Sequence, residues 1–270
     1  EQFAKLQKEL PGEVYITRTL ATYSYELNNK KAPFDNANIR KALNLSLDRN
    51  VITDKVLGQG QTPTYVFTPT YIEEGHLIQQ PAYSKEPMAQ RNEEAIKLLE
   101  EAGYSKANPL KFSILYNTNE NHKKVAIAAA SMWKANTKGL IDVKLENQEW
   151  KTYIDSRRAG RYDAARAGWN ADYNQATTFG NYFLSNSSNN TAKYANPEYD
   201  KAIAESYVAT DAEGRAKAYA KAEEILAKDF GIVPIFNYVN PRLVKPYVKG
   251  YSGKDPQDHI YLRNLYIIKH

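Results

Sequence analysis

The chain has 270 residues, of which 42% are hydrophobic and 25% charged, which is the balance of a globular protein with one large domain or two small ones. The absence of cysteine excludes disulfide scaffolds, cysteine zinc sites and thiol nucleophiles, and no apolar run approaches the ~18 residues of a membrane helix. The net charge of +5 does not indicate a nucleic-acid partner, because basic and acidic residues are interspersed.

The first third of the chain combines a strand, two helices and a long connection. A short polar helix pattern opens the chain, and a β-rich run follows from Val14 to Tyr25. From Asn38 the small and apolar residues fall on one face of a helix. A second helix can be capped by Asp48 and ends at Gly58. Residues 59–90 hold four prolines and no periodicity, which predicts an irregular connection that lines or covers something.

Helix and strand patterns alternate in the middle of the chain, starting with a helix, over residues 91–104, 110–116, 120–137, 141–146, 150–159 and 162–169. A strand–helix–strand unit makes its two strands parallel, with a right-handed crossover. We therefore expect an α/β fold in which 110–116 and 141–146 are parallel neighbours.

The last third begins with a polar loop at 186–192. Two helices are predicted near 197–208 and 211–229, and an apolar β-like run follows from Ile232 to Tyr238. A final strand is predicted from Leu262 to Ile268.

Motifs of known enzymes are absent from the sequence: there is no G-x-S-x-G, H-E-x-x-H, Walker A or G-x-G-x-x-G pattern. The four histidines are scattered, and none lies at metal-ligand spacing from another, so no metal and no cofactor are expected. A catalytic triad assembled in space stays open. A serine within ~3 Å of His122 or His259, with a carboxylate behind it, would indicate a peptide hydrolase.

Aromatic and charged residues crowd into 150–174, namely Trp150, Arg157, Arg158, Arg161, Arg166, Trp169, Asp172 and Tyr173. Several of them lie at the C-terminal end of a predicted parallel strand, which is where open α/β sheets bind ligands. A carboxylate and several guanidinium groups in one cleft could hold both ends of a zwitterion. The alternative is an exposed patch of ion pairs beside two core tryptophans.

Long blocks of the sequence resemble family 5 of the extracellular solute-binding proteins. They are Pro33-Phe34-Asp35, Ile39–Leu43, Leu47-Asp48-Arg49, Leu115–Thr118, His122–Lys124, Asn147–Thr152, Arg166–Trp169, Ala171–Asn174 and Arg242–Pro246. The resemblance runs over essentially the whole chain. Members of the family are much longer, so the chain resembles their C-terminal half.

The resemblance implies two lobes that are joined by two crossing segments and enclose a peptide. Residues 23–238 are then a periplasmic binding protein-like lobe with a mixed, largely parallel sheet flanked by helices. Residues 1–22 and 239–270 are hinge-crossing segments of an incomplete first lobe. Some relatives carry a cysteine pair near positions 21 and 170, where this chain has Ala21 and Asn170.

The resemblance also implies a set of site residues. Asp172 matches the carboxylate that receives the peptide α-ammonium. The groups that match partners of the peptide carboxylate are His122, Arg157 and Arg166, and those that match pocket walls are Trp150, Trp169 and Tyr173. A position in the first turn of a helix suits His122 to this role, because free N–H groups attract anions there. The structural alternatives are a helix cap for His122, a surface charge for Arg157 and a core residue for Trp150.

The implied function is the binding of short peptides, through their backbone and charged termini, for delivery to the membrane subunits of an ABC importer. The resemblance implies a monomer in the periplasm of a Gram-negative cell, with no catalysis, nucleic acid or membrane insertion. Residue 1 is Glu and no apolar leader precedes it, so we expect a processed or shortened chain. The alternatives are capture of cell-wall peptides, peptide hydrolysis, and a partner-binding module with an apolar patch well above ~600 Å².

Overall fold

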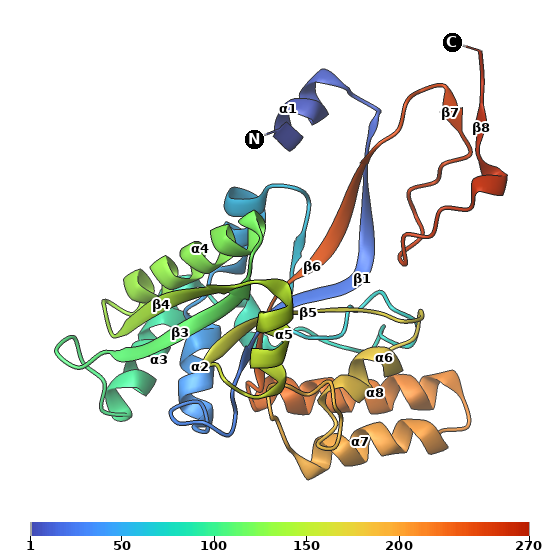
Figure 1. The fold of residues 1–270 in the computed structure, drawn as a ribbon. Coiled ribbons are helices and arrows are strands. Elements are labelled where there is room, and N and C mark those ends of the chain that lie inside the picture. The colour runs from blue at the N-terminus through green and yellow to red at the C-terminus, as the bar shows by residue number, and fades with distance from the viewer. Residues whose placement is uncertain (1, 270) are drawn as a thin grey trace.

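The computed structural model describes residues 2–269 and is built around one six-stranded mixed sheet with helices on both faces (Figure 1). The strand order is β2-β6-β1-β5-β3-β4. The strands are β1 (Val14–Leu27), β2 (Thr62–Pro63), β3 (Leu110–Asn117), β4 (Ile141–Gln148), β5 (Ala164–Asn170) and β6 (Ile232–Leu243).

The predicted parallel neighbours are confirmed, because β3 and β4 pair in parallel from Leu110 with Ile141 to Asn117 with Gln148. β5 continues this parallel part on the other side of β3. The expectation of a largely parallel sheet needs correction, however, because β1 is antiparallel to both β5 and β6, and β2 is antiparallel to β6. β1 and β6 lie outside the strand–helix–strand units, so no crossover helix sets their direction.

The helices follow the predicted periodicities closely. They are α1 (Gln2–Glu9), α2 (Ala37–Leu45), α3 (Met88–Glu101), α4 (Glu120–Asn136), α5 (Trp150–Arg158), α6 (Thr177–Gly180), α7 (Pro197–Val208) and α8 (Ala212–Lys228). Four short turns complete the set, the π-helical η1 (Val51–Leu57) and the 3-10 turns η2 (Ala82–Lys85), η3 (Asn181–Phe183) and η4 (Leu262–Asn264). Gly58 ends η1 with φ 61°, a left-handed conformation that suits glycine. No helix within 2–269 has the length and apolarity to cross a membrane.

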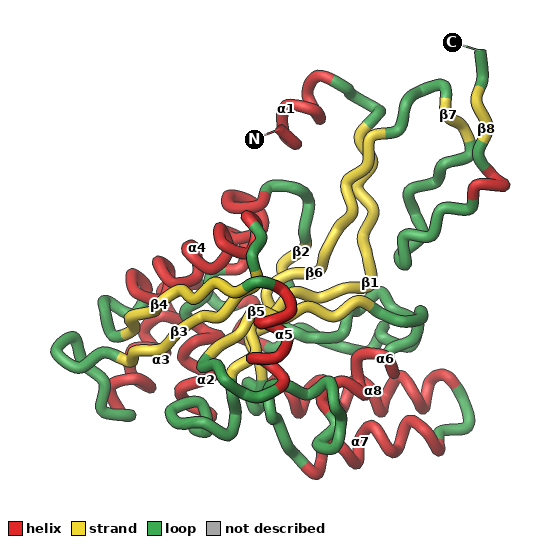
Figure 2. Tube along the Cα trace, in the orientation of Figure 1, coloured by secondary structure: helices red, strands yellow, loops and turns green. Residues whose placement is uncertain are grey.

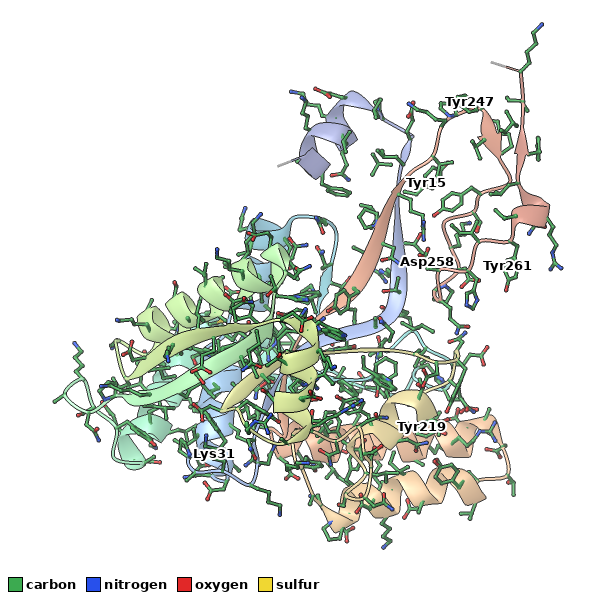
Figure 3. All side chains as sticks on the ribbon, viewed as in Figure 1. Tyr15, Lys31, Tyr219, Tyr247, Asp258 and Tyr261 are labelled. Carbon is green, nitrogen blue, oxygen red and sulfur yellow. The ribbon has the colours of Figure 1, made fainter. Side chains whose placement is uncertain are left out.

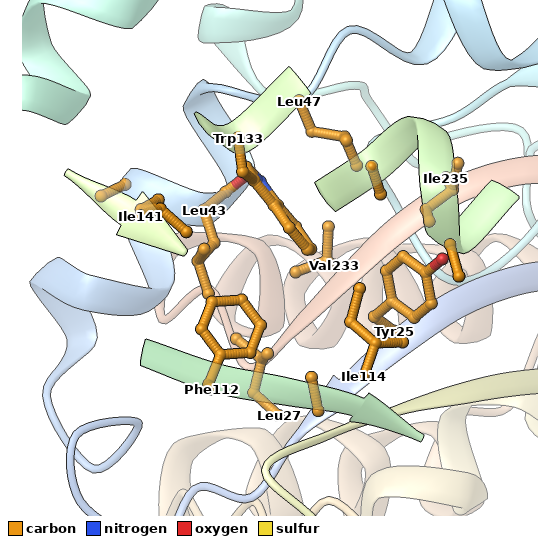
Figure 4. Close-up of a cluster of buried hydrophobic side chains, with 14 of the residues drawn as sticks. Tyr25, Leu27, Leu43, Leu47, Phe112, Ile114, Trp133, Ile141, Val233 and Ile235 are labelled. Atoms are coloured by element: carbon orange, nitrogen blue, oxygen red, sulfur yellow. The ribbon is translucent and has the colours of Figure 1, made fainter. Parts of the chain in front are cut away.

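The larger hydrophobic core lies between one face of the sheet and the helices α2, α3 and α4 (Figure 4). Trp133 is fully buried in it, and its indole Nε1 donates to the carbonyl oxygen of Leu43 at 2.9 Å. A second core packs α6, α7 and α8 together with the irregular connection around Phe67. β1 and β6 contribute side chains to both cores, so this part of the sheet lies between them.

β1 and β6 continue past the sheet as a two-stranded ribbon that carries α1 and the C-terminal segment away from the remainder (Figures 1 and 2). That segment contains a small hairpin of β7 (Val248–Lys249) and β8 (Tyr266–Ile267). The predicted final strand is therefore much shorter, because residues 262–264 form η4. The division into a lobe at 23–238 and two crossing segments stays a prediction.

The ladder between β1 and β6 is interrupted where the ribbon leaves the sheet. Arg18 pairs with Val239 and Thr22 with Asn237, so three residues of β1 lie opposite Tyr238 alone. Other segments bond to the backbone of this bulge. Leu20 N donates to Pro256 O at 2.8 Å, and Ala171 N donates to Leu20 O at 2.8 Å.

Candidate functional site

A groove of about 620 Å³ lies where β5 ends, beside the bulge in β1. Its lining comes from β1, α5, β5, β6 and the C-terminal segment, with Thr19, Leu20, Trp150, Arg166, Gly168, Asn170, Ala171, Tyr238, Asn240, Pro256, Gln257 and Asp258. Figure 3 shows Asp258 on the C-terminal segment, beside the ribbon. The groove therefore occupies the carboxyl end of a parallel strand, where ligand binding is expected.

Arg166 supplies the positive charge among the residues that line the groove, and its guanidinium group contacts two tyrosines. Its Nη2 donates to the hydroxyl of Tyr238 at 2.6 Å, and its guanidinium carbon lies 5.2 Å from the ring centre of Tyr23. Its Nε is buried without a hydrogen-bond partner, and within residues 2–269 no carboxylate forms an ion pair with it. A half-buried guanidinium with no acidic partner favours an anionic ligand.

His122 lies next to Arg166, in the first turn of α4. Its ring is 5.6 Å from that of Tyr23, and its Nδ1 is buried without a partner. Burial, and then the positive charge of Arg166, lower the pKa of His122 to about 3. The imidazole is therefore neutral near pH 7 and can donate a hydrogen bond, but it supplies no charge of its own.

Asp172 lies in the loop between β5 and α6, and its carboxylate is exposed. Its backbone N donates to Thr178 Oγ1 at 3.2 Å, and no cation within residues 2–269 forms an ion pair with it. Tyr173 follows in the same loop and is 45% exposed. The loop thus presents an unpaired negative charge beside the groove.

The two predicted tryptophan walls differ in position. Trp150 lines the groove at the start of α5, is 54% exposed, and stacks on Tyr153 with ring centres 5.8 Å apart. Trp169 donates from Nε1 to Thr178 O at 2.9 Å and packs against Tyr182 in the second core. Trp169 lies three residues after Arg166 on β5, so strand alternation turns it to the opposite face of the sheet from Arg166. The role of Trp169 as a wall stays a prediction.

Arg157 is buried in an ion pair rather than exposed in the groove. Its Nη2 lies 2.9 Å from Oε1 of Glu26, a fully buried carboxylate in β1. The same Nη2 donates to the hydroxyls of Tyr182 at 3.2 Å and Thr191 at 2.9 Å. Tyr182 and Thr191 also donate to Glu26, so the carboxylate is surrounded by donors.

The sheet separates Arg157 from Arg166. Arg166 pairs with Tyr25 in the β1–β5 ladder and shares its face, whereas Glu26 pairs with Ala165 and faces the other side. The structure therefore brings Arg166, His122 and Trp150 together and places Arg157 in a different polar cluster. Its role toward a peptide carboxylate stays a prediction.

Sequence reasoning missed Glu26, Tyr23 and Tyr238. Glu26 is a lone carboxylate in the apolar run of β1, which is a readable sign of a buried ion pair. The two tyrosines hold Arg166 from strands that are more than 200 residues apart in the chain, and no local pattern signals that contact.

A second groove, of about 920 Å³, lies on a different part of the surface, between the η2 region and α8. It is lined by apolar side chains and by charged residues, including the ion pairs of Lys41 with Glu94 and Lys228 with Glu224, and it contains none of the predicted site residues. Within residues 2–269 there is no group of side chains that could hold a metal ion. In the same range neither His122 nor His259 forms a hydrogen bond with a serine.

Comparison with known proteins gives consistent results. Residues 1–191 match the family model described as bacterial extracellular solute-binding proteins, family 5 Middle. The periplasmic oligopeptide-binding protein OppA of Haemophilus influenzae is 97% identical over 270 residues, which are 100% of this chain and 50% of that protein. The periplasmic murein peptide-binding protein MppA of Escherichia coli is 44% identical over 268 residues, 99% of this chain and 49% of that protein.

The fold is shared as well. The crystal structure of Haemophilus influenzae OppA in complex with RPPGFSPFR has a TM-score of 0.92 and 96% identity, covering 99% of this chain and 52% of that chain. The chain thus spans about half the length of the relatives it matches. The periplasmic binding protein-like architecture, with a mixed sheet flanked by helices, is confirmed. The chain belongs to family 5 of the bacterial extracellular solute-binding proteins.

Proposed function

We propose that this chain is the peptide-capturing half of a periplasmic solute-binding protein, and that the complete protein delivers short peptides to the membrane subunits of an ABC importer. Arg166 carries the proposal, as a half-buried cation that lines the groove without an acidic partner among residues 2–269. A peptide carboxylate would supply the missing negative charge. The names of the relatives, which bind oligopeptides or murein peptides, support the same ligand class.

In this proposal Asp172 receives the α-ammonium group of the peptide. Its carboxylate is exposed and lacks a cationic partner within residues 2–269, and it follows Arg166 by six residues along β5 and its loop. His122 donates a neutral hydrogen bond to the peptide carboxylate, and Trp150 forms a wall. From the resemblance of the sequence, we also propose that Arg157 meets a peptide carboxylate and that Trp169 and Tyr173 form pocket walls.

The proposed mechanism is binding without covalent chemistry. Backbone groups and the two termini are common to all peptides, so contacts to them allow many sequences to bind, while waters adapt to each side chain at little cost. Residues 23–238 act as one lobe, and residues 1–22 and 239–270 cross to the other. Enclosure between the lobes removes the charge pairs from water and strengthens them. We assign the protein to the periplasm as a monomer.

The test is Asp172→Asn in a two-lobed protein that contains these 270 residues. Removing one partner of a buried charge pair typically costs ~3–5 kcal/mol, or about two to three and a half decades of affinity. The variant should lose that affinity for a tripeptide with a free N-terminus, and much less for the same peptide after N-acetylation. Calorimetry of both ligands, with the melting temperature, gives the answer.

The matched variant is Arg166→Gln, which should penalise peptides with a free carboxylate over amidated ones. Equal losses for free and acetylated peptides in Asp172→Asn, with a lowered melting temperature, would remove Asp172 from the binding site.

Cell-wall peptides are the second candidate ligand, because a relative with 44% identity is named as a murein peptide-binding protein. A murein tripeptide carries D-residues and a meso-diaminopimelate group, whereas an ordinary tripeptide has L-residues alone. A preference of at least about tenfold for the murein tripeptide, or about 1.4 kcal/mol, would favour the cell-wall class.

A further inference from the structure

Asp172 itself is held by only long hydrogen bonds within its loop. Asp172 N donates to Thr178 Oγ1 at 3.2 Å, and Thr178 Oγ1 lies as far as 3.5 Å from Asp172 Oδ2. The helix that follows, α6, has four residues. A binding carboxylate needs a fixed position, so its support must come from other segments.

A turn of the irregular connection, residues 71–76, lies alongside this loop and bonds to it three times. Glu73 N donates to Asn174 Oδ1 at 3.2 Å, and Ala176 N donates to Glu73 O at 3.0 Å. Gln175 Nε2 donates to Glu74 Oε2 at 2.9 Å. The turn and the loop are therefore joined by hydrogen bonds into one unit.

Glu74 ties this unit to α8. Arg215, in the first turn of α8, approaches Oε1 of Glu74 from Nε at 2.8 Å and from Nη2 at 2.7 Å. The side chain of Glu74 is only 11% exposed, and its backbone has φ 64°, a left-handed conformation that is uncommon for a residue other than glycine. One carboxylate oxygen thus faces the helix and the other faces the loop.

The polar contacts return to the same helix. Gln175 Oε1 accepts from Thr177 Oγ1 at 2.6 Å, and Thr177 Oγ1 lies 3.0 Å from the hydroxyl of Tyr219. Tyr219, which Figure 3 shows on α8, follows Arg215 by one helical turn. The i, i+4 spacing places the two side chains on the same face of the helix. Two successive turns of α8 are therefore linked to this part of the chain, through Arg215 to Glu74 and through Tyr219 to Thr177.

We propose that Glu74 is a positioning residue for the α-ammonium site, which it serves by joining the Asp172 loop to α8 through Arg215. This inference rests on the proposed function, because it assigns Glu74 to the site in which Asp172 binds the ligand. An ordinary ion pair between Lys221 of α8 and Glu205 of α7 links two exposed side chains and touches no part of the groove. It provides the matched control.

The experiment measures affinity for the free and N-acetylated forms of one tripeptide in the two-lobed protein. At metal sites, loss of the outer partner that orients a ligating side chain typically costs ~10–100-fold in affinity, and we expect the lower end of that range here. Glu74→Ala should weaken binding of the free peptide by about tenfold and of the acetylated peptide by less than about twofold. Glu74→Gln should lose less, because its amide oxygen still accepts from Gln175. Glu205→Gln should change neither affinity.

A double variant separates the two proposals. In an Asp172→Asn background, Glu74→Ala should no longer change the ratio of the two affinities. If Asp172→Asn leaves the ratio unchanged, the proposed function fails. If Asp172→Asn changes it and Glu74→Ala does not, or if Glu74→Ala weakens both ligands equally, the positioning role is refuted.

Amide hydrogen exchange on the 270-residue chain gives a second readout that needs no ligand. Glu74→Gln and Arg215→Met should accelerate exchange at residues 171–177, and Glu205→Gln should not. Unchanged exchange in both variants would overturn the inference.

Discussion

Replacing Arg157 by Met tests whether this residue is structural or free to meet a ligand. The substitution removes the guanidinium but keeps an unbranched apolar side chain. It leaves Glu26, whose side chain is 1% exposed, without its 2.9 Å ionic partner. The hydroxyls of Tyr182 and Thr191 remain as donors, but neither carries a charge.

Breaking a buried ion pair by removing one partner typically costs ~3–5 kcal/mol of unfolding free energy. With a urea m-value of ~3 kcal/mol per molar, the midpoint should fall by about 1 M or more. The double variant Glu26→Gln/Arg157→Met should recover part of this loss, because no buried charge then remains. Arg158→Met is the matched control, since it is exposed on the same helix and should change stability by less than ~0.5 kcal/mol.

The assay is urea unfolding of the 270-residue chain, followed by tryptophan fluorescence. A loss below ~1 kcal/mol in Arg157→Met is the size expected for an exposed pair. That result would contradict the buried ion pair and would leave the guanidinium available for a peptide carboxylate.

Three further outcomes are expected. The folded state keeps His122 neutral, with a pKa of about 3 against the ordinary 6.5, because of burial and then Arg166. The neutral imidazole therefore makes its full contribution to the free energy of unfolding above pH 6.5, and this contribution is lost as the pH falls toward 3. The loss between pH 7 and 5 is ~2 kcal/mol before solvent screening and about half that after it. His122→Gln should flatten this dependence in urea unfolding, and an unchanged slope would contradict it. The 270-residue chain alone should bind tripeptides more weakly than ~0.1 mM, since charge pairs left in water contribute only ~0–1 kcal/mol each, and micromolar binding by calorimetry would refute this. Trp133→Ala should lose ~3–5 kcal/mol in the same unfolding assay, and a loss under ~1 kcal/mol would show that the core collapses around the site.

The parallel part of the sheet could be predicted because its information is local. The alternation in β3 and β4 and the helical period of α4 each lie within one segment, and the crossover rule does the rest. The antiparallel part could not, because pairing between β1 and β6 joins residues more than 200 positions apart. β6 also runs on to Leu243, past the predicted end at Tyr238. Pro241 looks like a break, yet it lies in the outer ribbon, where β6 has β1 as its neighbour and a free edge tolerates proline.

The site was predictable to the extent that it lies on one strand and its loop. Arg166 and Asp172 follow from the end of β5, whose direction the periodicity predicts. The burial of Arg157 could not be predicted, because it depends on Glu26, which lies 131 positions earlier. The support of the Asp172 loop by Glu74 comes from an irregular connection with no period at all.

The bulge in β1 has a mechanical consequence. Ladder bonds join β1 to β6 on both sides of it, whereas the three residues opposite Tyr238 lack regular ladder partners, so a bend of the ribbon against the sheet is easiest here. Leu20 in this bulge bonds to Pro256 on one side and to Ala171, the neighbour of Asp172, on the other. Tyr238 meanwhile holds Arg166. A rotation of the ribbon at this bulge would therefore displace Arg166 and the loop of Asp172 together, because both are bonded to the same short stretch of backbone.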